Sequence, residues 1–322
     1  MGRCAPCAYQ SGMRVLVTGS SGWLGTTLVP RLRADGHAVI GLDPAPGATT
    51  DIVGSQADRA LVRAAIGDHR IDAIVHGGAL HKPNIETHGR EQFLRVNVEG
   101  TFNLLEEAVA QGATRFVFTS TTSLMINREI RAASGAEAAW LTEAVNPMPR
   151  NIYGVTKLAA EHLCRLTSEL NGLPVVILRT ARFFPEADDM AHEIVQSGPN
   201  TKANEFLFRR LTVSDAAEAH VAALAKAPGL GCDLFVVSAT PPFTPADCAE
   251  LIRDAPAVVA RHFPDYPAIY ARHGWTMFDR IDRVYDPGHA ARRLGFRCAT
   301  DFRKVLDDIA GPGPLPDYLT TS

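Results

Sequence analysis

The sequence predicts an α/β fold in which one parallel sheet carries helices on both faces. Two observations lead to this prediction. Short apolar runs rich in β-branched residues alternate with longer helix-like stretches over the first 180 residues, and a glycine-rich turn follows the first run. Continuous apolar runs are typical of strands buried on both faces, and strand–helix alternation is typical of βαβ units. Right-handed crossovers then place the helices on both faces of a doubly wound sheet.

The elements can be assigned in chain order from these patterns. Strands are expected at 13–18, 37–42, 50–53, 71–76, 115–119 and 174–178, and helices at 23–34, 58–66, 91–111 and 151–170. Gly36 stands just after the first helix, at the position where helices commonly end. The last third is less regular, with helices expected at 214–226, 245–254 and 286–294 and one strand at 233–237.

Composition and charge narrow the class of protein. The chain has 322 residues, of which 46% are hydrophobic and 21% charged, and its formal net charge is -3. This is ordinary for a soluble globular protein. We see no apolar run of the roughly 18 residues that a membrane span needs and no basic stripe, so neither a membrane nor a nucleic acid is expected as a partner.

The cysteines suggest no metal site. Cys4 and Cys7 form one CxxC pair in the first twelve residues, without the second pair that a zinc site needs. The other four cysteines are scattered along the chain. Scattered thiols fit a reducing compartment, and we expect a cytoplasmic protein whose residues 1–12 form a flexible extension.

The glycine-rich turn after the first strand has the form GxxGxxG. Gly19 allows a sharp turn out of the strand, Gly22 lets the backbone approach a pyrophosphate, and Gly25 lets the helix pack closely on the strand. The helix N-terminus then offers free N–H groups to phosphate oxygens. Glycine turns are common, but the strand before this one and the helix after it predict a dinucleotide site in a Rossmann-type domain.

The second strand ends in Asp43, which bears on the choice of dinucleotide. Its carboxylate would accept hydrogen bonds from the adenosine ribose hydroxyls and would repel a 2′-phosphate. We therefore favour NAD over NADP. The alternative is that Asp43 is an ordinary turn residue before Pro44.

Tyr153 and Lys157 form a YxxxK pair at the start of a predicted helix, so both side chains share one helix face. A phenol ionises near pH 10, but a lysine cation one turn away favours the phenolate. Tyr153 would then take a proton from a substrate hydroxyl while hydride leaves the same carbon. The alternative is a surface tyrosine beside a solvated lysine.

The fifth strand runs into four hydroxyl residues, Ser120 to Ser123. Ligands of open α/β sheets bind beyond the carboxyl ends of the strands. A hydroxyl at this place would hydrogen-bond the substrate oxygen beside Tyr153. An ordinary polar strand end is the alternative.

Together these pieces resemble the extended short-chain dehydrogenase/reductase family, in its NAD-dependent epimerase/dehydratase group. The resemblance runs from about residue 13 to 296. It is carried by the segments VLVTGSSGWLG, GLD, IVHGGAL, VNVEGTFNLLEEA, FVFTST, NIYGVTKLAAE and VVILRTARFF, and more loosely by SDAAEAH and ARRLGF.

The resemblance implies roles for further residues. Thr121 matches the hydroxyl residue of the catalytic triad, with Tyr153 and Lys157, which would also hold the nicotinamide ribose. The remaining cofactor contacts that it implies come from backbone and polar groups at Trp23, Leu24, Gly77, Gly78, Ala79 and Asn97.

The chain also departs from the family pattern in four places. Ser55 and Gln56 stand where the family has an acid that meets the adenine, and Thr122 and Ser123 replace the Asp-Glu pair of sugar dehydratases. The second change disfavours 4,6-dehydration and leaves Thr122 as a candidate substrate contact. Arginines in two further segments could bind an anionic substrate or serve as structural ion-pair partners: Arg182, Arg209 and Arg210.

From these residues we expect an NAD-binding domain at 13–180 and a smaller substrate lobe at 181–322, with 205–240 returning to the first domain. The expected activity is hydride transfer between NAD and a hydroxyl or carbonyl carbon of a sugar or nucleotide-sugar-like small molecule. Alternatives are a simple dehydrogenase of a non-nucleotide carbonyl compound and an idle NAD-sensing binding protein. By resemblance alone, we expect a homodimer that pairs through helices 91–111 and 151–170.

Overall fold

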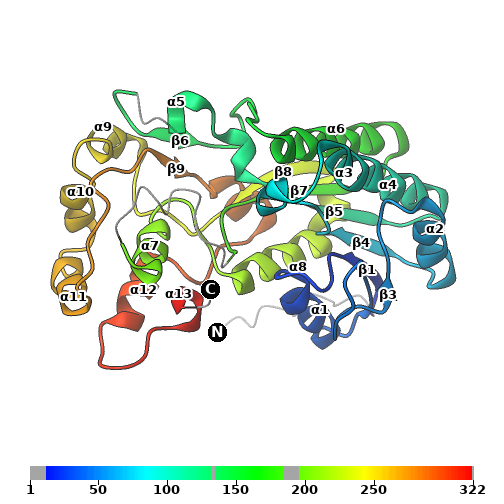
Figure 1. The fold of residues 1–322 in the computed structure, drawn as a ribbon, viewed down its shortest axis with the longest axis horizontal. Coiled ribbons are helices and arrows are strands. Elements are labelled where there is room, and N and C mark those ends of the chain that lie inside the picture. Colours follow the sequence, from blue (N-terminus) through cyan, green and yellow to red (C-terminus); the bar gives the residue numbers. More distant parts are fainter. Residues whose placement is uncertain (1–11, 132–134, 185–195, 321–322) are drawn as a thin grey trace, which may run out of the picture.

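The computed structural model describes residues 12–131, 135–184 and 196–320. The Cys4–Cys7 pair lies outside the described residues. Figure 1 shows two lobes side by side, the larger built on the sheet and the smaller formed mainly by helices from the last third of the chain. The strands of the sheet are β1 (Arg14–Thr18), β2 (Ala38–Asp43), β3 (Ile52–Val53), β4 (Ala73–His76), β5 (Arg115–Thr121), β7 (Val175–Thr180) and β8 (Cys232–Val237).

The strand order explains where a ligand can bind. Among the described residues the sheet has seven strands in the order β3-β2-β1-β4-β5-β7-β8, and every neighbouring pair is parallel. The chain adds strands outward from β1 on one side and then crosses to β4 on the other. The carboxyl ends of β1 and β4 therefore flank the point at which the order reverses, where such sheets bind ligands. The observed topology confirms the predicted α/β, Rossmann-type fold.

Helices cover both faces of this sheet, as Figure 1 shows: α4 and α6 lie side by side on one face, and α1 and α8 lie on the other. The helical segments of this lobe are α1 (Gly25–Ala34), α2 (Arg59–Asp68), η1 (Lys82–Glu86), α3 (Arg90–Phe93), η2 (Leu94–Glu99), α4 (Gly100–Ala110), α6 (Ile152–Asn171) and α8 (Val213–Leu230).

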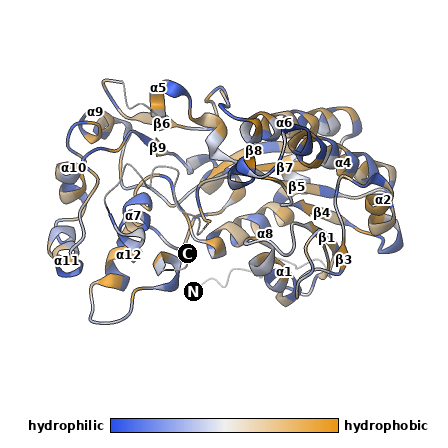
Figure 2. Cartoon of the chain, in the orientation of Figure 1, coloured by the Kyte–Doolittle hydropathy of each residue, from blue (hydrophilic) through white to orange (hydrophobic). Residues whose placement is uncertain are grey.

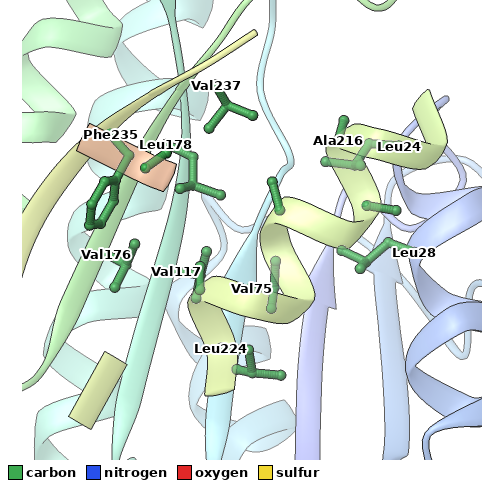
Figure 3. Close-up of a cluster of buried hydrophobic side chains, with 14 of the residues drawn as sticks. Leu24, Leu28, Val75, Val117, Val176, Leu178, Ala216, Leu224, Phe235 and Val237 are labelled. Carbon is green, nitrogen blue, oxygen red and sulfur yellow. The ribbon is translucent and has the colours of Figure 1, made fainter. Parts of the chain in front are cut away.

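The two faces of the sheet bury separate sets of side chains. Val117 belongs to the core beneath α1 and α8, while its neighbours Phe116 and Phe118 belong to the core on the other face. This alternation is what a strand with a side-chain period of two produces when both faces are covered. Figure 3 shows the first core, where Leu24 just before α1, Leu28 of α1 and Leu224 of α8 meet residues of the strands.

The predicted single helix at 91–111 is wrong in detail. The structure divides this stretch into α3, the π-helical turn η2 and α4. Asn97 lies within the widened turn, where its side chain accepts from the backbone N–H of Leu80 at 2.8 Å and donates to the Leu80 carbonyl at 2.8 Å. Such wide turns are often found next to functional sites.

The smaller lobe has a hydrophobic core of its own, to which Phe206, Tyr270 and Phe302 contribute. Figure 2 shows hydrophobic and hydrophilic residues mixed along its helices, as expected for short helices that each bury one side. Its elements are α5 (Arg128–Arg131), β6 (Ala139–Leu141), α7 (Gly198–Glu205), η4 (Pro245–Asp247), α9 (Cys248–Leu251), α10 (Ala255–His262), α11 (Tyr266–His273), β9 (Arg283–Tyr285), α12 (Phe302–Ile309) and α13 (Asp317–Thr320). Two further helical segments, η3 (Thr122–Met125) and η5 (Ala290–Leu294), pack on the larger lobe, η3 against α6 and η5 against α8 and β8.

The chain passes between the two lobes several times. Strand β6, which precedes α6 in the chain, pairs in parallel with β9, so a segment from the first half of the chain belongs to the smaller lobe. After α7 the chain returns to the sheet as α8 and β8. None of the helices described here has the length and apolar character that crossing a membrane requires.

Candidate functional site

A cleft of about 1090 Å³ lies at the carboxyl ends of the central strands. Its walls come from the turn after β1, the segments after β4, β5 and β7, the start of α6, and strand β9 of the smaller lobe. Gly19 and Tyr285, 266 positions apart in the chain, both line it. The site therefore lies between the lobes, at the place that the strand order favours.

The glycine turn has the geometry of a phosphate cradle. Gly19 has φ +75°, and a Cβ built on it would lie 2.7 Å from the backbone nitrogen of Gly78. A Cβ on Gly25 would lie 2.2 Å from the carbonyl oxygen of Gly19. Side chains are therefore excluded where the first helix meets the end of β1. Gly22, Trp23 and Leu24 also line the cleft, next to the start of α1.

Asp43 lies at the edge of the same cleft with only 8% of its surface exposed. Its carboxylate accepts from the backbone N–H of Ala45 at 2.8 Å and from that of Ser21 at 3.2 Å. These bonds hold the carboxylate beside the glycine turn. A diol that enters the cleft here would meet an acceptor with a fixed orientation.

Other predicted cofactor residues surround the end of β4. Ser55, Gln56, Gly77, Gly78 and Ala79 all line the cleft. The buried amide of Gln56 donates to the carbonyl of Gly78 at 3.1 Å, and this bond joins the two segments. Gln56 is thus a neutral side chain that holds the backbone at the end of β4.

Asn97 is placed differently. It does not line the cleft, and its amide donates to the hydroxyl of Thr156 at 3.0 Å, in addition to its bonds with Leu80. Thr156 in turn donates to the carbonyl of Tyr153 at 2.9 Å. In this structure Asn97 therefore connects the cleft wall after β4 to the first turn of α6.

Tyr153 and Lys157 reach the cleft from the start of α6. Asn151 caps this helix, because its side chain accepts from the N–H of Gly154 at 2.9 Å while its backbone is extended. The cap fixes where the helix begins and so where Tyr153 enters the cleft. The predicted pair is brought to one wall of one cavity.

Lys157 is buried, with 3% of its surface exposed, and its Nζ lies 4.0 Å from the centroid of the Phe118 ring. Burial lowers the pKa of Lys157 to about 7, although Cys164 and Glu161 raise it. A lysine with this pKa can gain or lose a proton near neutrality, unlike a solvated lysine.

The hydroxyl residues at the end of β5 differ in burial and in hydrogen-bond partner. Thr121 lines the cleft half-buried, and its Oγ1 donates to the hydroxyl of Ser123 at 3.0 Å. Thr122 also lines the cleft but is buried, and it donates to the carbonyl of Thr180 at 3.3 Å. Of the two, Thr121 has the more accessible hydroxyl in the cleft.

A buried ionic network lies behind this wall. Arg179 of β7 donates two hydrogen bonds to Glu161 of α6, at 2.9 and 2.7 Å, and Ser120 of β5 donates to the same carboxylate at 2.6 Å. The side chains of Arg179 and Glu161 are 3% and 2% exposed. The network joins the strand that ends in Thr121 to the helix that carries Lys157.

The three predicted arginines cluster but do not all reach the cleft. Arg182 and Arg209 line it, whereas Arg210 does not. The buried guanidinium of Arg210 donates to Glu205 at 2.6 Å, and Arg209 forms an ion pair with the same carboxylate at 2.8 Å. Substrate contact by Arg210 would have to be indirect in this geometry.

Several cleft residues were not predicted from the sequence. Phe184 stacks on His81 with ring centroids 5.1 Å apart, and the His81 ring lies 6.4 Å from that of Tyr153. Burial, and secondarily Lys157, lowers the pKa of His81. Arg283 and Tyr285 enter from β9, whose three residues gave no recognisable strand signal. The Phe183–Phe184 pair, five positions after the predicted strand at 174–178, was the one signal available.

The arrangement fits a dinucleotide. The closely packed glycines place backbone N–H groups and the start of a helix at one wall, where phosphate oxygens could accept hydrogen bonds. The Asp43 carboxylate, held by backbone hydrogen bonds, lies beside them and could accept hydrogen bonds from a ribose diol. Within the described part of the chain, no group of three or more His, Cys, Asp or Glu side chains is placed to hold a metal ion.

Comparison with known proteins identifies the family. The model of the NAD dependent epimerase/dehydratase family matches residues 15–231. A UDP-glucose 4-epimerase from Erwinia amylovora is 28% identical over 214 residues, which cover 61% of this chain and 60% of that protein. A 3 beta-hydroxysteroid dehydrogenase/Delta 5→4-isomerase from Mycobacterium tuberculosis is 30% identical over 185 residues, covering 54% of this chain and 48% of that protein. The matches thus span about half to three fifths of these relatives' length.

Solved structures share the fold over almost the whole chain. A UDP-glucose 4-epimerase from Thermotoga maritima, solved with UDP-glucose, has a TM-score of 0.66 at 20% identity and covers 91% of this chain and 96% of its own. The Thermus thermophilus UDP-glucose 4-epimerase complex with NAD has a TM-score of 0.62 at 21% identity, covering 94% and 100%. The family match confirms the predicted cofactor, NAD, and the predicted enzymatic character of the chain. This protein is an enzyme of the NAD-dependent epimerase/dehydratase family.

Proposed function

We propose that the enzyme transfers hydride between NAD and a hydroxyl-bearing carbon of a sugar or nucleotide-sugar-like substrate, with Tyr153 as the general base. The observation that carries this proposal is that one cleft contains both the glycine turn and the set Thr121, Tyr153 and Lys157. Cofactor and reacting groups would then meet in a single cavity between the lobes.

Each residue has a stated part in the reaction. Bound NAD supplies the hydride acceptor. Tyr153 takes the proton of the substrate hydroxyl, and the hydroxyl of Thr121 donates a hydrogen bond to the same oxygen. Lys157, when protonated, favours the phenolate form of Tyr153 and lies one helical turn away, on the face that lines the cleft.

The cofactor would lie along the glycine turn and the end of β4. Backbone groups at Gly19, Gly22, Trp23, Leu24 and Gly25 would contact the pyrophosphate, and Asp43 the adenosine ribose. Ser55, Gln56, Gly77, Gly78 and Ala79 would line the adenine side and the middle of the dinucleotide. Asn97 would act by holding the backbone of Leu80 in place.

The choice of substrate rests on the relatives. The three UDP-glucose 4-epimerases named above support a nucleotide sugar, for which the regenerated cofactor would be retained through each cycle. The mycobacterial steroid dehydrogenase supports a second candidate, a net dehydrogenase of a non-nucleotide compound. The cleft also has apolar walls, to which Phe183 and Phe184 contribute, so it can accept either kind of ligand.

We further propose a homodimer and a cytoplasmic location. Exposed apolar side chains gather on neighbouring helices, with Phe102 on α4 and Leu166 and Leu170 on α6. The cysteines of the described residues, Cys164, Cys232, Cys248 and Cys298, are free thiols, which fits a reducing compartment.

The test starts with mass spectrometry of small molecules released from the denatured, purified enzyme. Retained NAD supports an epimerase-like cycle, and absorbance at 340 nm with UDP-glucose and added NAD then detects any net oxidation. Tyr153→Phe should abolish turnover and leave NAD binding unchanged, because it removes only the ionisable hydroxyl. Unchanged turnover in this variant would refute the assigned general base.

A further inference from the structure

A buried histidine lies directly behind one wall of the cleft. His220 of α8 is fully buried, and it ends the segment SDAAEAH, for which the sequence indicates no chemical role. Its Nδ1 lies 2.7 Å from the carbonyl oxygen of Ala216, and its Nε2 lies 2.8 Å from the hydroxyl oxygen of Thr119. Thr119 belongs to β5 and lines the cleft. The imidazole ring therefore connects α8 to a surface that a ligand in the cleft would meet.

These two hydrogen bonds determine where the ring carries its proton. The carbonyl of Ala216 can only accept, so Nδ1 carries the hydrogen and donates it. Burial lowers the pKa of His220 to about 4, so the ring is neutral near pH 7 and its Nε2 carries no hydrogen. Nε2 is therefore an acceptor, and the hydroxyl of Thr119 donates its hydrogen to it.

The bond to His220 leaves Thr119 with only one kind of hydrogen bond to offer the cleft. A hydroxyl group has one hydrogen and two lone pairs. Because the hydrogen is donated to the histidine, the oxygen can act toward a ligand only as an acceptor. A phosphate or carboxylate oxygen, which is itself an acceptor, would find no partner at Thr119, whereas an O–H or N–H group would.

Thr119 lies between the glycine turn and the reacting groups. A Cβ added to Gly77 would lie 3.7 Å from the hydroxyl oxygen of Thr119 and 3.8 Å from a methyl group of Leu24, so this hydroxyl is close to the predicted cofactor contacts. Thr121 follows two positions later on the same face of β5, about 6.6 Å further along the strand. Hydride transfer requires the nicotinamide ring to reach Thr121 and Tyr153, and the nicotinamide half of the dinucleotide would then lie over Thr119.

We propose that Thr119 is a cofactor-binding residue whose hydroxyl oxygen accepts a hydrogen bond from the nicotinamide half of NAD, and that His220 is the positioning residue that holds the hydroxyl hydrogen away from the cofactor. The donors in that half of NAD are the two ribose hydroxyls and the carboxamide group. The proposal rests on the proposed placement of NAD along this cleft. It adds two residues to cofactor recognition, one of which does not line the cleft.

The experiment measures binding, without turnover, to the full-length enzyme after bound nucleotide has been removed. Calorimetric titrations use three probes: NAD, ADP-ribose, which lacks the nicotinamide ring, and AMP, which lacks the whole nicotinamide half. Thr119→Val removes the hydroxyl and keeps the shape of the side chain, so it should weaken NAD binding by about 3- to 10-fold and leave AMP binding unchanged. Thr119→Ser keeps the hydroxyl and should bind NAD as the parent does.

ADP-ribose identifies the donor. If Thr119→Val weakens ADP-ribose as much as NAD, the donor is a ribose hydroxyl. If it weakens NAD alone, the donor is the carboxamide. Thr114→Val is the matched control, because Thr114 is exposed, does not line the cleft, and donates its hydroxyl hydrogen to the carbonyl of Asp72 at 3.0 Å. This control should bind all three probes as the parent does.

A double-variant cycle tests whether His220 acts through Thr119. His220→Leu removes the acceptor, so the Thr119 hydroxyl can turn its hydrogen toward the cleft, and NAD binding should weaken by about 2- to 5-fold. In the Thr119→Val background the same change should have no further effect on NAD binding, because no hydroxyl is left to orient. His220→Gln again offers an acceptor oxygen to Thr119 and should restore most of the affinity.

Two results would overturn the proposal. One is an affinity of Thr119→Val for NAD that equals that of the parent. The other is an additive cycle, in which His220→Leu weakens NAD binding equally with and without the hydroxyl at position 119. Failure of the cofactor placement itself is a separate result. If Asp43→Asn changes the preference between NAD and NADP while Thr119→Val binds NAD normally, the cofactor lies in the cleft and only the role of Thr119 and His220 is refuted.

Discussion

The ammonium nitrogen of Lys157 lies over the ring of Phe118, 4.0 Å from its centroid. Phe118 belongs to β5 and to the core on the α6 face, so the lysine meets an aromatic surface instead of water. The ring face attracts a cation, but burial lowers the pKa of Lys157 to about 7. This relationship leads to a prediction about stability.

The free energy of unfolding should depend on pH through Lys157. Between pH 7 and the ordinary pKa of 10.5, the unfolded chain binds a proton at this lysine that the folded enzyme has released. The folded state therefore gains stability as pH rises through this window, by up to about 1.4 kcal/mol per pH unit. Below pH 7 Lys157 is protonated in both the folded and the unfolded state, so its contribution to the free energy of unfolding no longer changes with pH.

Urea unfolding of NAD-free enzyme at pH 7, 8 and 9 measures the effect. The free energy of unfolding of the parent should increase with pH relative to that of Lys157→Met. Lys226→Met, at an exposed position, serves as the control and should show a difference that does not change with pH. A constant difference for Lys157→Met would mean that the buried lysine stays protonated.

The second prediction concerns the ion pair behind the active-site wall. Glu161→Gln removes the negative partner of Arg179 and leaves a buried guanidinium whose charge is uncompensated, which should destabilise the fold by about 3–5 kcal/mol. It also removes a group that raises the pKa of Lys157, so that pKa should fall further.

Chemical denaturation checks this second prediction. The double variant Glu161→Gln with Arg179→Met should recover part of the loss, because no unpaired buried charge remains. The half-exposed pair of Arg31 and Glu218 supplies the control, and Glu218→Gln should cost less than about 1 kcal/mol. Equal losses in the two carboxylate variants would refute the role assigned to burial.

The third prediction concerns cofactor choice at Asp43. Asp43→Asn keeps a side chain that can bond to the backbone but removes the charge that would repel a 2′-phosphate. We expect NAD to bind less tightly and NADP more tightly, with a combined change in preference of about tenfold or more. Fluorescence titrations with NADH and NADPH measure it. Asp68→Asn, at an exposed position in α2, is the control, and an unchanged preference for NAD in Asp43→Asn would reject the assignment.

Much of this arrangement could be predicted because local patterns determine it. The seven described strands of the parallel sheet were expected in order, most of them from continuous apolar runs, and the glycine turn marked one wall of the cleft. The four-residue spacing of Tyr153 and Lys157 at the start of a predicted helix placed both side chains on one face. These features depend on residues close together in sequence.

The parts that were missed depend on long-range contacts. Strands β6 and β9 have three residues each and pair with one another across 144 positions, so neither has a pattern of its own. Arg283 reaches the cleft only through that pairing. The division of 91–111 by η2 is linked to the bonds between Asn97 and Leu80, which the helical periodicity of the sequence could not indicate.

The last prediction concerns the proposed dimer. Leu166 and Leu170 of α6 are 50% and 70% exposed, and Phe102 of the neighbouring α4 is 39% exposed. Apolar side chains gathered on two adjacent helices favour a helical interface between copies of the chain. Replacing both leucines with glutamate should place like charges opposite one another in a twofold interface and yield a monomer in sedimentation velocity.

The control variant is Val53→Glu, at an exposed apolar position on β3, and it should remain dimeric. A parent enzyme that sediments as a monomer at micromolar concentration would reject the dimer, and a dimeric double variant would place the interface on another surface.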